Sequence, residues 1–496
     1  MKSGIKNTRI LVLLTLMSMI STFTKAQINI AFYPLEEQFN SYNLNPAFLN
    51  PQNRFTFSIF PMGGTSIGYN NQLVIRQLVT KFLSGGTTDQ DYRDILKSMA
   101  DRSSFNQSVE STLLSFTYRS DFGNFNFRVK ENESFSISMK GSLTDFVIRT
   151  GIQTAEINQV QNLPAQALHY REYSLGYTLP GNHHRFTAGI RAKLYFGKGA
   201  FSSGLSGTIK KDGANYLLQA QGKVLISVPE LNAFNTDGTL NSVSLFGGSK
   251  TISYLMNRGN PGFGVDLGFK YRITPALSVS ASVIDLGKIN WKSNLNSKDL
   301  VGQYRIAGST VNSHVSSNGT ELITKKFDNN SSISDSINNL FHITYDHSAF
   351  TTTLPVSAYA GLKYQVSPAM NINLMDKYVI INKMSYNSIL ASASMVVNKK
   401  LTVNAGYAVI GNSYFNIPVA LLFKKDFGQI YVGTDNLAAF ILPSISEFAG
   451  FTFGTCFYLF RKRDLSKPTD EYFPFFRPRK IKKRSNGLIL KEYPES

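Results

Sequence analysis

The sequence has only one cysteine, Cys456, and one tryptophan, Trp291, among its 496 residues. A single thiol forms no internal disulfide and excludes zinc or iron–sulfur sites built from several cysteines. We expect Cys456 to be a small apolar residue of the last strand. The sequence also lacks the G-x-S-x-G, H-E-x-x-H and P-loop patterns. The chain is therefore not expected to be an enzyme, and no catalytic residue, metal site or cofactor is predicted.

Long hydrophobic runs are missing beyond the first 26 residues. The N-terminus has a basic start with Lys2, Lys6 and Arg9, followed by the apolar run Ile10–Ile20. This run is too short for a transmembrane helix, which needs about 20 apolar residues. Small residues then precede Ala26–Gln27, which predicts a secretory signal peptide cleaved at that bond. We therefore expect the mature protein to have no transmembrane helix.

Charged residues are scarce, at 17%, whereas aromatic residues make up 12% of the chain. This balance suits a protein that covers lipid with apolar atoms and places rings at both interfaces. The formal charge of +19 would suit nucleic acid, but a secreted chain meets none, so no nucleic-acid partner is expected. The expected partners are outer-membrane lipid and the phosphates of lipopolysaccharide.

Alternating apolar and polar residues dominate the second half of the chain. Examples are Gly262–Ile273, Leu277–Asp285, Leu401–Ile410 and Tyr414–Lys424. Alternation with period two predicts β-strands, and about ten residues suffice for a tilted strand to cross a bilayer. The sequence therefore predicts an all-β fold, a transmembrane antiparallel β-barrel of about 14 strands, within a range of about 12 to 16. The competing fold is a soluble β-sandwich or propeller.

The alternation predicts individual strands at 111–119, 124–130, 134–140, 143–149, 169–179, 185–197, 201–210, 215–228, 262–273, 276–289, 354–366, 370–382, 385–397, 400–410, 414–425, 428–437 and 447–460. Short turns are expected at 180–184, 211–215, 274–276, 367–369, 398–400 and 425–428. Longer connections are expected at 229–261, 290–353 and 438–446. Short periplasmic turns and longer extracellular loops are typical of outer-membrane barrels. Both chain termini are then expected on the periplasmic side.

Four segments are predicted: the signal peptide 1–26, an N-terminal hatch 27–110, the barrel 111–460 and a basic periplasmic tail 461–496. Within the hatch, Asn71–Leu83 and Tyr92–Ala100 have helical spacing. The hatch is expected inside the barrel or as a periplasmic cap, and the alternative is a separate α-helical subdomain outside it.

Two acidic residues within the predicted strands and the single tryptophan just beyond one of them are candidates for a specific role. Asp266 and Asp285 are expected to face the lumen, where they line a pore, bind a cation of the hatch, or are ordinary lumen residues. Trp291 is expected at the extracellular rim, where interfacial rings occur.

A short repeat is also present, GFKYRITPALSV at 268–279 and GLKYQVSPAMNI at 361–372, and it predicts two similar hairpins.

Two sequence motifs and the predicted helical insert at 71–100 together resemble a known family. The motifs are Asn45-Pro46-Ala47-Phe48 and the hairpin at 262–291 that ends with Asp285-Leu286-Gly287 and Trp291. The chain resembles an uncharacterised family of Bacteroidota outer-membrane β-barrel proteins, a domain of unknown function. The Asn-Pro-Ala element is also similar to one in fatty-acid-transporter-like barrels and type IX secretion barrels. This resemblance implies an N-terminal hatch and about 14 strands, and it supplies no ligand-binding residues.

The tail after Phe460 combines aromatic, proline and basic residues. Segments of this kind order on a partner, for which the candidates are a periplasmic protein, peptidoglycan or the lower rim of the barrel; the alternative is a disordered, solvated tail. The candidate contact residues are Phe473, Phe475, Phe476, Arg477, Lys480, Lys482, Lys483 and Arg484. Two functions remain open from the sequence. One is passive transport of small or hydrophobic solutes, and the other is a non-conducting scaffold or accessory subunit of a secretion, gliding or surface-assembly complex.

Overall fold

The structure, a computed structural model, describes residues 29–48, 53–70, 104–138, 161–179, 185–212, 215–228, 253–295, 297–307, 341–381, 384–411, 413–442 and 446–459. All of them belong to the first of two compact units, residues 1–460, and the second unit is 461–496. The predicted signal peptide, the predicted helices within 71–100 and the tail lie outside the described residues.

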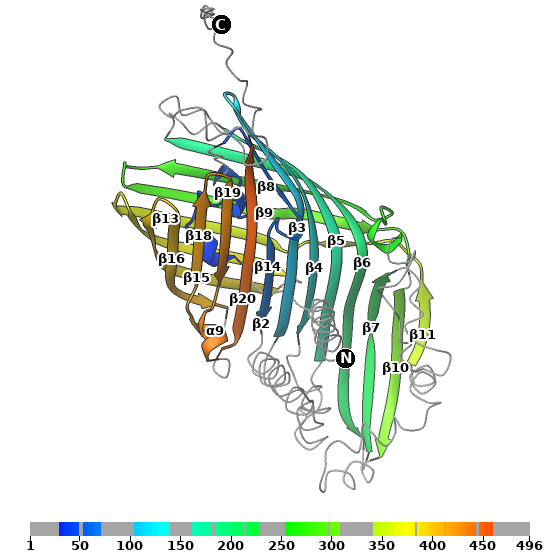
Figure 1. Ribbon diagram of the computed structural model, residues 1–496. Coiled ribbons are helices and arrows are strands. Elements are labelled where there is room, and N and C mark those ends of the chain that lie inside the picture. Colours follow the sequence, from blue (N-terminus) through cyan, green and yellow to red (C-terminus); the bar gives the residue numbers. More distant parts are fainter. Residues whose placement is uncertain are drawn as a thin grey trace, which may run out of the picture. The chain divides into compact units, whose positions relative to one another are not determined.

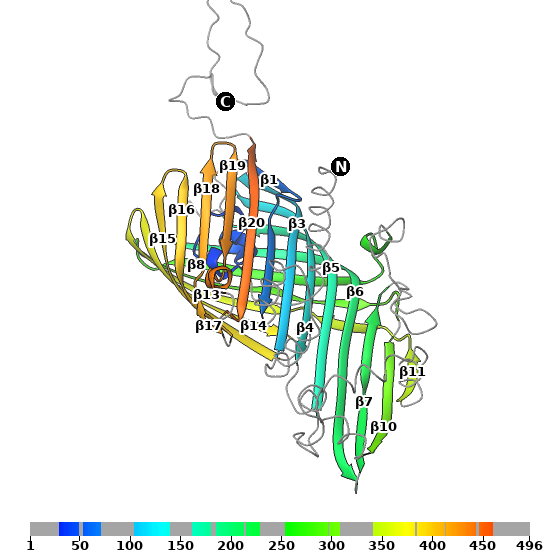
Figure 2. The same cartoon turned by 60° about the horizontal axis from the view of Figure 1, so that its bottom comes forward.

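The described strands form one antiparallel sheet that closes on itself (Figures 1 and 2). Its strands are β1 Phe55–Ile59, β2 Thr65–Asn70, β3 Ser104–Ser120, β4 Gly123–Ser138, β5 Gln161–Thr178, β6 Phe186–Asp212, β7 Asn215–Ser227, β8 Pro261–Arg272, β9 Leu277–Trp291, β10 Ser297–Ala307, β11 Phe341–Asp346, β12 Phe350–Thr353, β13 Val356–Ser367, β14 Met370–Ile381, β15 Met384–Asn398, β16 Leu401–Ile410, β17 Ser413–Asn416, β18 Val419–Lys425, β19 Gly428–Thr434 and β20 Phe448–Leu459. Short helices are η2 Ile30–Phe32, η3 Phe39–Asn43, η4 Pro46–Phe48 and α9 Ala438–Ile441.

The pairing of these strands gives a closed barrel of 14 strand positions. β1 and β2 share one position between β20 and β3, and β17 and β18 share another next to β16. The ring then runs β3, β4, β5, β6, β8, β9, β13, β14, β15, β16, β18, β19 and β20. β7 pairs with residues 200–212 of β6, and β10 and β11 follow it, so these three strands extend the sheet outside this ring. The predicted antiparallel barrel of about 14 strands is confirmed.

The two faces of the wall have opposite character, as the alternating sequence predicts. Apolar side chains cover the outer face and are exposed. Examples are Leu114, Phe116, Phe127, Leu175, Ile190, Leu267, Leu362, Leu374, Ile389 and Phe453. Polar side chains lie on the inner face and are buried. Examples are Ser115, Asn126, Arg128, Glu172, Arg191, Lys193, Asp266, Ser282, Asn373 and Asn404. This is the reverse of a soluble domain, whose core is apolar.

The short turns predicted at 274–276, 367–369, 398–400 and 425–428 lie at one end of the barrel. Each turn joins two neighbouring strands that remain paired as far as the turn. Leu459, the last described residue of β20, pairs with Phe55 at the same end. The residues described contain no helix long and apolar enough to cross a bilayer.

The sheet differs from the predicted strands in three places. It begins at Phe55 rather than at the expected boundary of 111, because β1 and β2 pair with both β3 and β20. β4 continues through the break expected near 131. The segments 185–197 and 201–210 are one strand, β6, of 27 residues. The turn at 211–215 therefore lies at the opposite end of the sheet from the turns at 274–276, 367–369, 398–400 and 425–428. Its predicted periplasmic position is wrong.

Glycines explain why β6 is longer than its sequence indicates. The sequence predicts a break in the strand at 198–200, but the chain stays extended there, and a register shift opposite His169 and Tyr170 of β5 leaves Lys198 as one extra residue of β6. A Cβ atom on Gly197 would lie 2.5 Å from the ring of Trp291. Gly197 is therefore required by close packing, not by a turn.

We expect Gly197→Ala to lower the free energy of unfolding by about 1–3 kcal/mol, because an added methyl group overpacks against a rigid ring. Gly204→Ala on the same strand is the matched control, since its Cβ would meet no atom closer than 3.9 Å. Denaturant titration of the detergent-folded protein measures both changes. Equal stabilities of the two variants would contradict this explanation of the extended strand.

Candidate functional site: the N-terminal plug and the lumen

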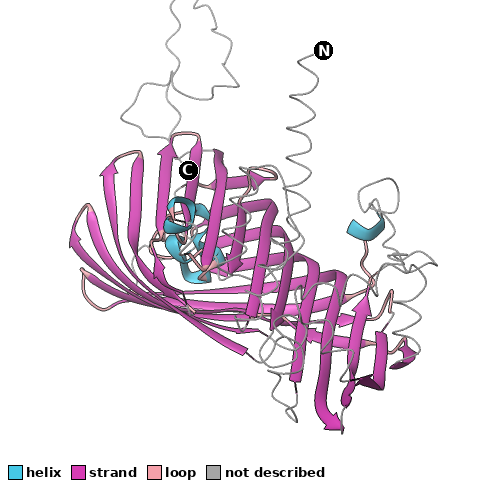
Figure 3. Ribbon diagram, turned by 90° about the horizontal axis from the view of Figure 1, so that it is seen from below, coloured by secondary structure: helices cyan, strands magenta, loops and turns pink. Residues whose placement is uncertain are grey.

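Residues 29–48, named the plug here, fill the lumen of the barrel. Figure 3 shows their short helices inside the ring of strands. Ile30 and Ala31 are fully buried, and Tyr42 and Asn45 are 1% and 0% exposed. Side chains or carbonyl groups from β2, β3, β4, β5, β6, β8, β9, β16, β19 and β20 hydrogen-bond to the plug. The expectation of an N-terminal hatch inside the barrel holds for this segment.

One half of the plug packs against an apolar part of the inner wall. Ile30, Phe32 and Leu35 share a buried cluster with inward-facing residues of β14–β20, among them Met375, Leu390, Ala420, Leu422 and Tyr431. The Phe32 ring meets Tyr431 edge-on with centroids 5.7 Å apart, and Tyr33 stacks on Tyr359 at 5.4 Å. Burial of apolar area stabilises this half of the closed state.

The start of the plug is also fixed by its backbone. The Asp435 carboxylate, just beyond β19, accepts the N–H groups of Asn29 and Ala31 at 2.7 and 2.9 Å. The Asn404 amide donates to the Ala31 carbonyl at 2.9 Å. Buried peptide groups need such partners, and the wall supplies them here.

The other half of the plug lies on a cluster of buried charges. Arg191 pairs with Asp266 at 2.8 Å, and Lys193 pairs with Asp266 at 2.9 Å. Arg128 pairs with Glu172, which also lies 3.5 Å from Lys193. These side chains are at most 1% exposed. Buried charges persist only when paired and hydrogen-bonded, so this cluster fixes the relative positions of β4, β5, β6 and β8.

The plug takes part in that cluster. Arg128 donates to the Asn43 side chain and Arg191 to the Tyr42 carbonyl. Both guanidinium groups also face the Tyr42 ring, 5.9 and 5.0 Å from its centroid. Cation–π contacts of desolvated arginines are worth about 2 kcal/mol. Sequence analysis did not single out Arg128, Arg191 or Lys193; the available signal was basic residues at inward positions of alternating strands.

Asp266 and Asp285 face the lumen, as expected, but they bind cations of the wall. Asp285 contacts Lys193 at 2.6 Å, and its own N–H donates to Asp266 at 2.7 Å. Asp285 has φ of 63° at an irregularity in the β8–β9 register, a backbone region that aspartate tolerates better than most residues. Residues 29–48 contain no lysine or arginine, so this segment offers no cation to Asp266 or Asp285, and residues 71–103 of the predicted hatch lie outside the described residues.

The Asn-Pro-Ala motif docks on β8 and β9. The Asn45 amide donates to the carbonyls of Phe269 and Ala281 at 3.3 and 3.2 Å, and its oxygen accepts the Ala47 N–H at 2.9 Å. The Pro46 carbonyl accepts the Thr178 hydroxyl at 2.6 Å. A Cβ atom on Gly268 would lie 2.1 Å from the Asn45 oxygen. The motif is thus a plug-docking element.

The other motif residues form the bend and end of β9. Gly287 lies against Gly264 and the Phe263 carbonyl, and Leu286 is 46% exposed on the outer face. Trp291 is 0% exposed, and its ring N–H donates to Thr352 at 2.9 Å. The prediction of an interfacial ring is therefore wrong, because this indole packs against Gly197 and Phe350. Cys456 is buried against Phe39 and Tyr42 of the plug.

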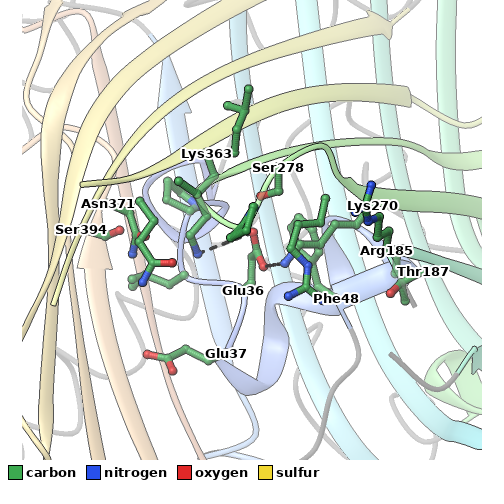
Figure 4. A pocket seen from close by; sticks show the side chains of 18 of the residues that line it. Glu36, Glu37, Phe48, Arg185, Thr187, Lys270, Ser278, Lys363, Asn371 and Ser394 are labelled. Carbon is green, nitrogen blue, oxygen red and sulfur yellow. Dashed lines mark hydrogen bonds and ion pairs between the residues drawn. The ribbon is translucent and has the colours of Figure 1, made fainter. Parts of the chain in front are cut away.

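Cavities lie on both sides of the plug. One of about 100 Å³ is lined by Asn29, Asn43 and Leu44 of the plug and by Lys130, Lys193, Asp285 and Lys377 of the wall. The other, of about 510 Å³, opens at the short-turn end and is lined by Glu36, Glu37 and Phe48 of the plug (Figure 4). Within the described residues, the plug separates these two spaces.

Ion pairs join the plug to the wall at the short-turn end. Glu36 contacts Lys270 of β8 and lies 3.6 Å from Lys363 of β13. Glu37 contacts Lys424 of β18. Burial of the Glu36 carboxyl acts to raise its pKa, but the charges of Lys363 and Lys270 outweigh this, so the pKa is lowered. Glu36 is therefore ionised at neutral pH.

Several predicted features are not tested by this structure. The tail residues Phe473, Phe475, Phe476, Arg477, Lys480, Lys482, Lys483 and Arg484 lie outside the described residues. The part of the chain that is described contains no group of three or more His, Cys, Asp or Glu side chains placed to hold a metal ion.

Comparison with known families places residues 46–435 within a family of unknown function, DUF5723. This match covers most of the chain, so the protein belongs to that family of domains of unknown function. The match confirms that part of the resemblance. No curated protein matches the sequence.

Similar solved structures include proteins of three bacteria. A FadL homologue of Pseudomonas aeruginosa has a TM-score of 0.39 and 10% identity, with 88% of this chain and 98% of that chain covered. The toluene transporter TodX of Pseudomonas putida has a TM-score of 0.35 and 10% identity, with 88% and 94% covered. The toluene transporter TbuX of Ralstonia pickettii has a TM-score of 0.36 and 10% identity, with 84% and 92% covered.

We expect Asn45→Ala to loosen the plug without opening the barrel wall, because the part-buried carbonyls of Phe269 and Ala281 lose the Asn45 donor, at a total cost of about 1–3 kcal/mol. Hydrogen exchange of the plug amides measures this loosening, and denaturant titration measures global stability. Asn290→Ala is the control, since among the described residues the Asn290 side chain makes one hydrogen bond, which it accepts from the exposed Thr351. Unchanged exchange of the plug would rule out a docking role for the motif.

Proposed function

We propose that this protein is an outer-membrane transport barrel for small or hydrophobic solutes, closed in this structure by its N-terminal plug. The observation that carries the proposal is a plug that fills a polar lumen and leaves a cavity on each side. A wall that is apolar outside and polar inside suits lipid around it and water within it. The predicted signal peptide supports export to the outer membrane.

The height of the apolar outer face supports a membrane location. On β5 the outward residues are Leu179, just past the strand, then Tyr177, Leu175 and Tyr173, and then Arg171. Arg171 pairs with Glu131 of β4 at 2.6 Å. Eight residues of strand extend about 26 Å, or about 20 Å along the normal when tilted, close to the apolar band of about 25 Å in such barrels. Outer-membrane lipid and lipopolysaccharide are the proposed surroundings.

Leu374→Arg tests the membrane location. Leu374 lies on the outer face near the middle of that band, 51% exposed and paired with Leu362. We expect this change to make folding into lipid vesicles less favourable by about 2–4 kcal/mol. Val301→Arg is the matched control, because Val301 is 60% exposed on β10, outside the ring, and an exposed site in water changes stability by about 0.5 kcal/mol or less. Equal effects would argue against a lipid-facing wall.

Conductance in planar bilayers tests transport. We expect the intact protein to be closed and a variant lacking residues 29–48 to conduct, because the deletion removes every described side chain of the plug. The heat-dependent shift in electrophoretic migration typical of folded barrels verifies that the variant is folded. A folded, inserted variant that neither conducts nor allows swelling of solute-loaded liposomes would overturn the transport proposal.

A folded deletion variant that does not conduct would favour the second candidate function. That function is a non-conducting scaffold or accessory subunit of a secretion, gliding or surface-assembly complex. The observation that favours it is the sheet formed by β6, β7, β10 and β11, which continues beyond the barrel ring. The tail 461–496 is the proposed contact for a periplasmic protein. Assignment to Bacteroidota and a relation to type IX secretion stay predictions.

A further inference from the structure

The short repeat in the sequence contributes to one shared site. Its copies at 268–279 and 361–372 form the short-turn ends of the β8–β9 and β13–β14 hairpins, which are neighbours because β9 pairs with β13. The glycine that begins each copy makes room for the plug. A Cβ atom on Gly268 would collide with Asn45, and one on Gly361 would lie 2.6 Å from the Tyr33 ring.

The lysine two positions after each glycine turns to the same carboxylate. Lys270 and Lys363 both contact Glu36 of the plug, and Figure 4 shows them on either side of it. Lys270 and Lys363 are 31% and 27% exposed, and Glu36 is 18% exposed. The repeated hairpins therefore build a carboxylate site at the open end of the 510 Å³ cavity, and a residue of the chain itself occupies that site.

The cavity around this site carries more positive than negative charge. Arg185 and Arg272 line it in addition to the two lysines, whereas among the described residues the acidic lining consists of Glu36 and Glu37. No ion pair joins Arg185 or Arg272 to another described residue, and Figure 4 shows Arg185 beside Lys270. Guanidinium and ammonium groups bind carboxylates and phosphates through charge-assisted hydrogen bonds. The volume suits a small organic molecule.

We propose that this cavity is a binding site for small oxyanions, carboxylates or phosphates, which compete with Glu36 for Lys270 and Lys363. Arg185 and Arg272 contact the remainder of the anion. An anion bound there replaces the plug carboxylate on both lysines and so removes the Glu36 ion pairs at this end of the plug. The closed barrel can bind the anion whether or not it transports solutes. Only the idea that the anion arrives from the periplasm rests on the proposed function.

Calorimetric titration of the full-length detergent-folded protein with citrate and with inorganic phosphate tests the site. We expect Glu36→Gln to bind at least one of these probes about tenfold more tightly than the unaltered protein, since the lysines lose their internal competitor. Glu37→Gln makes the same change in net charge but leaves Glu36 on Lys270 and Lys363. It is expected to stay within about twofold of the unaltered protein. The comparison of the two probes distinguishes a carboxylate site from a phosphate site.

The tighter binding of Glu36→Gln is expected to disappear when Lys270→Gln and Lys363→Gln are added. It is expected to remain when Lys400→Gln is added instead, because Lys400 lies at a short turn outside the cavity. The heat-dependent electrophoretic shift confirms that each variant is folded. An equal gain in Glu37→Gln would show a general charge effect and overturn the proposal. So would the absence of any gain in Glu36→Gln. Neither result depends on conductance, so the transport proposal can fail separately.

Discussion

The plug depends on the inner wall for the hydrogen bonds that its own backbone does not make. Residues 29–48 contain only short turns of 3₁₀-helix, so many of their peptide groups have no partner within the plug. Asp435, Asn404, Ser282, Thr178 and Arg191 supply donors or acceptors to these groups. An unpaired buried peptide group costs about 1–3 kcal/mol. The inner face therefore has to be polar at defined positions.

The two halves of the lumen hold the plug by different forces. The wall from β14 to β20 offers aliphatic and aromatic side chains to Ile30 and Phe32, and this contact is non-directional. The wall from β4 to β9 offers paired charges that require defined geometry. Tyr42 of the plug contacts both Arg128 and Arg191 through the face of its ring. The apolar half supplies attraction, and the charged half sets the orientation of the plug.

The barrel was predictable from the sequence because alternation records which residues face lipid and which face the lumen. Individual features failed where a side chain's partner lies far away in the chain. The strand break predicted at 198–200 is absent, and Gly197 there packs against the distant Trp291 ring. The sequence predicts Trp291 at the membrane interface, but Thr352 and Phe350 cover it. The role of Asn45 depends on carbonyls more than 200 residues away. Periodicity carries no information about such contacts.

Water and salt reach only part of the ionic interface between plug and wall. Arg128, Glu172, Arg191 and Asp266 are at most 1% exposed, so dissolved ions screen them little. The pairs of Glu36 and Glu37 are different, since Lys270, Lys363 and Lys424 are 26% to 31% exposed. Exposed pairs are weak, about 0–1 kcal/mol, and sensitive to salt. A change in the solution at the short-turn end therefore acts first on residues 36 and 37, while the buried contacts on either side keep the rest of the plug in place.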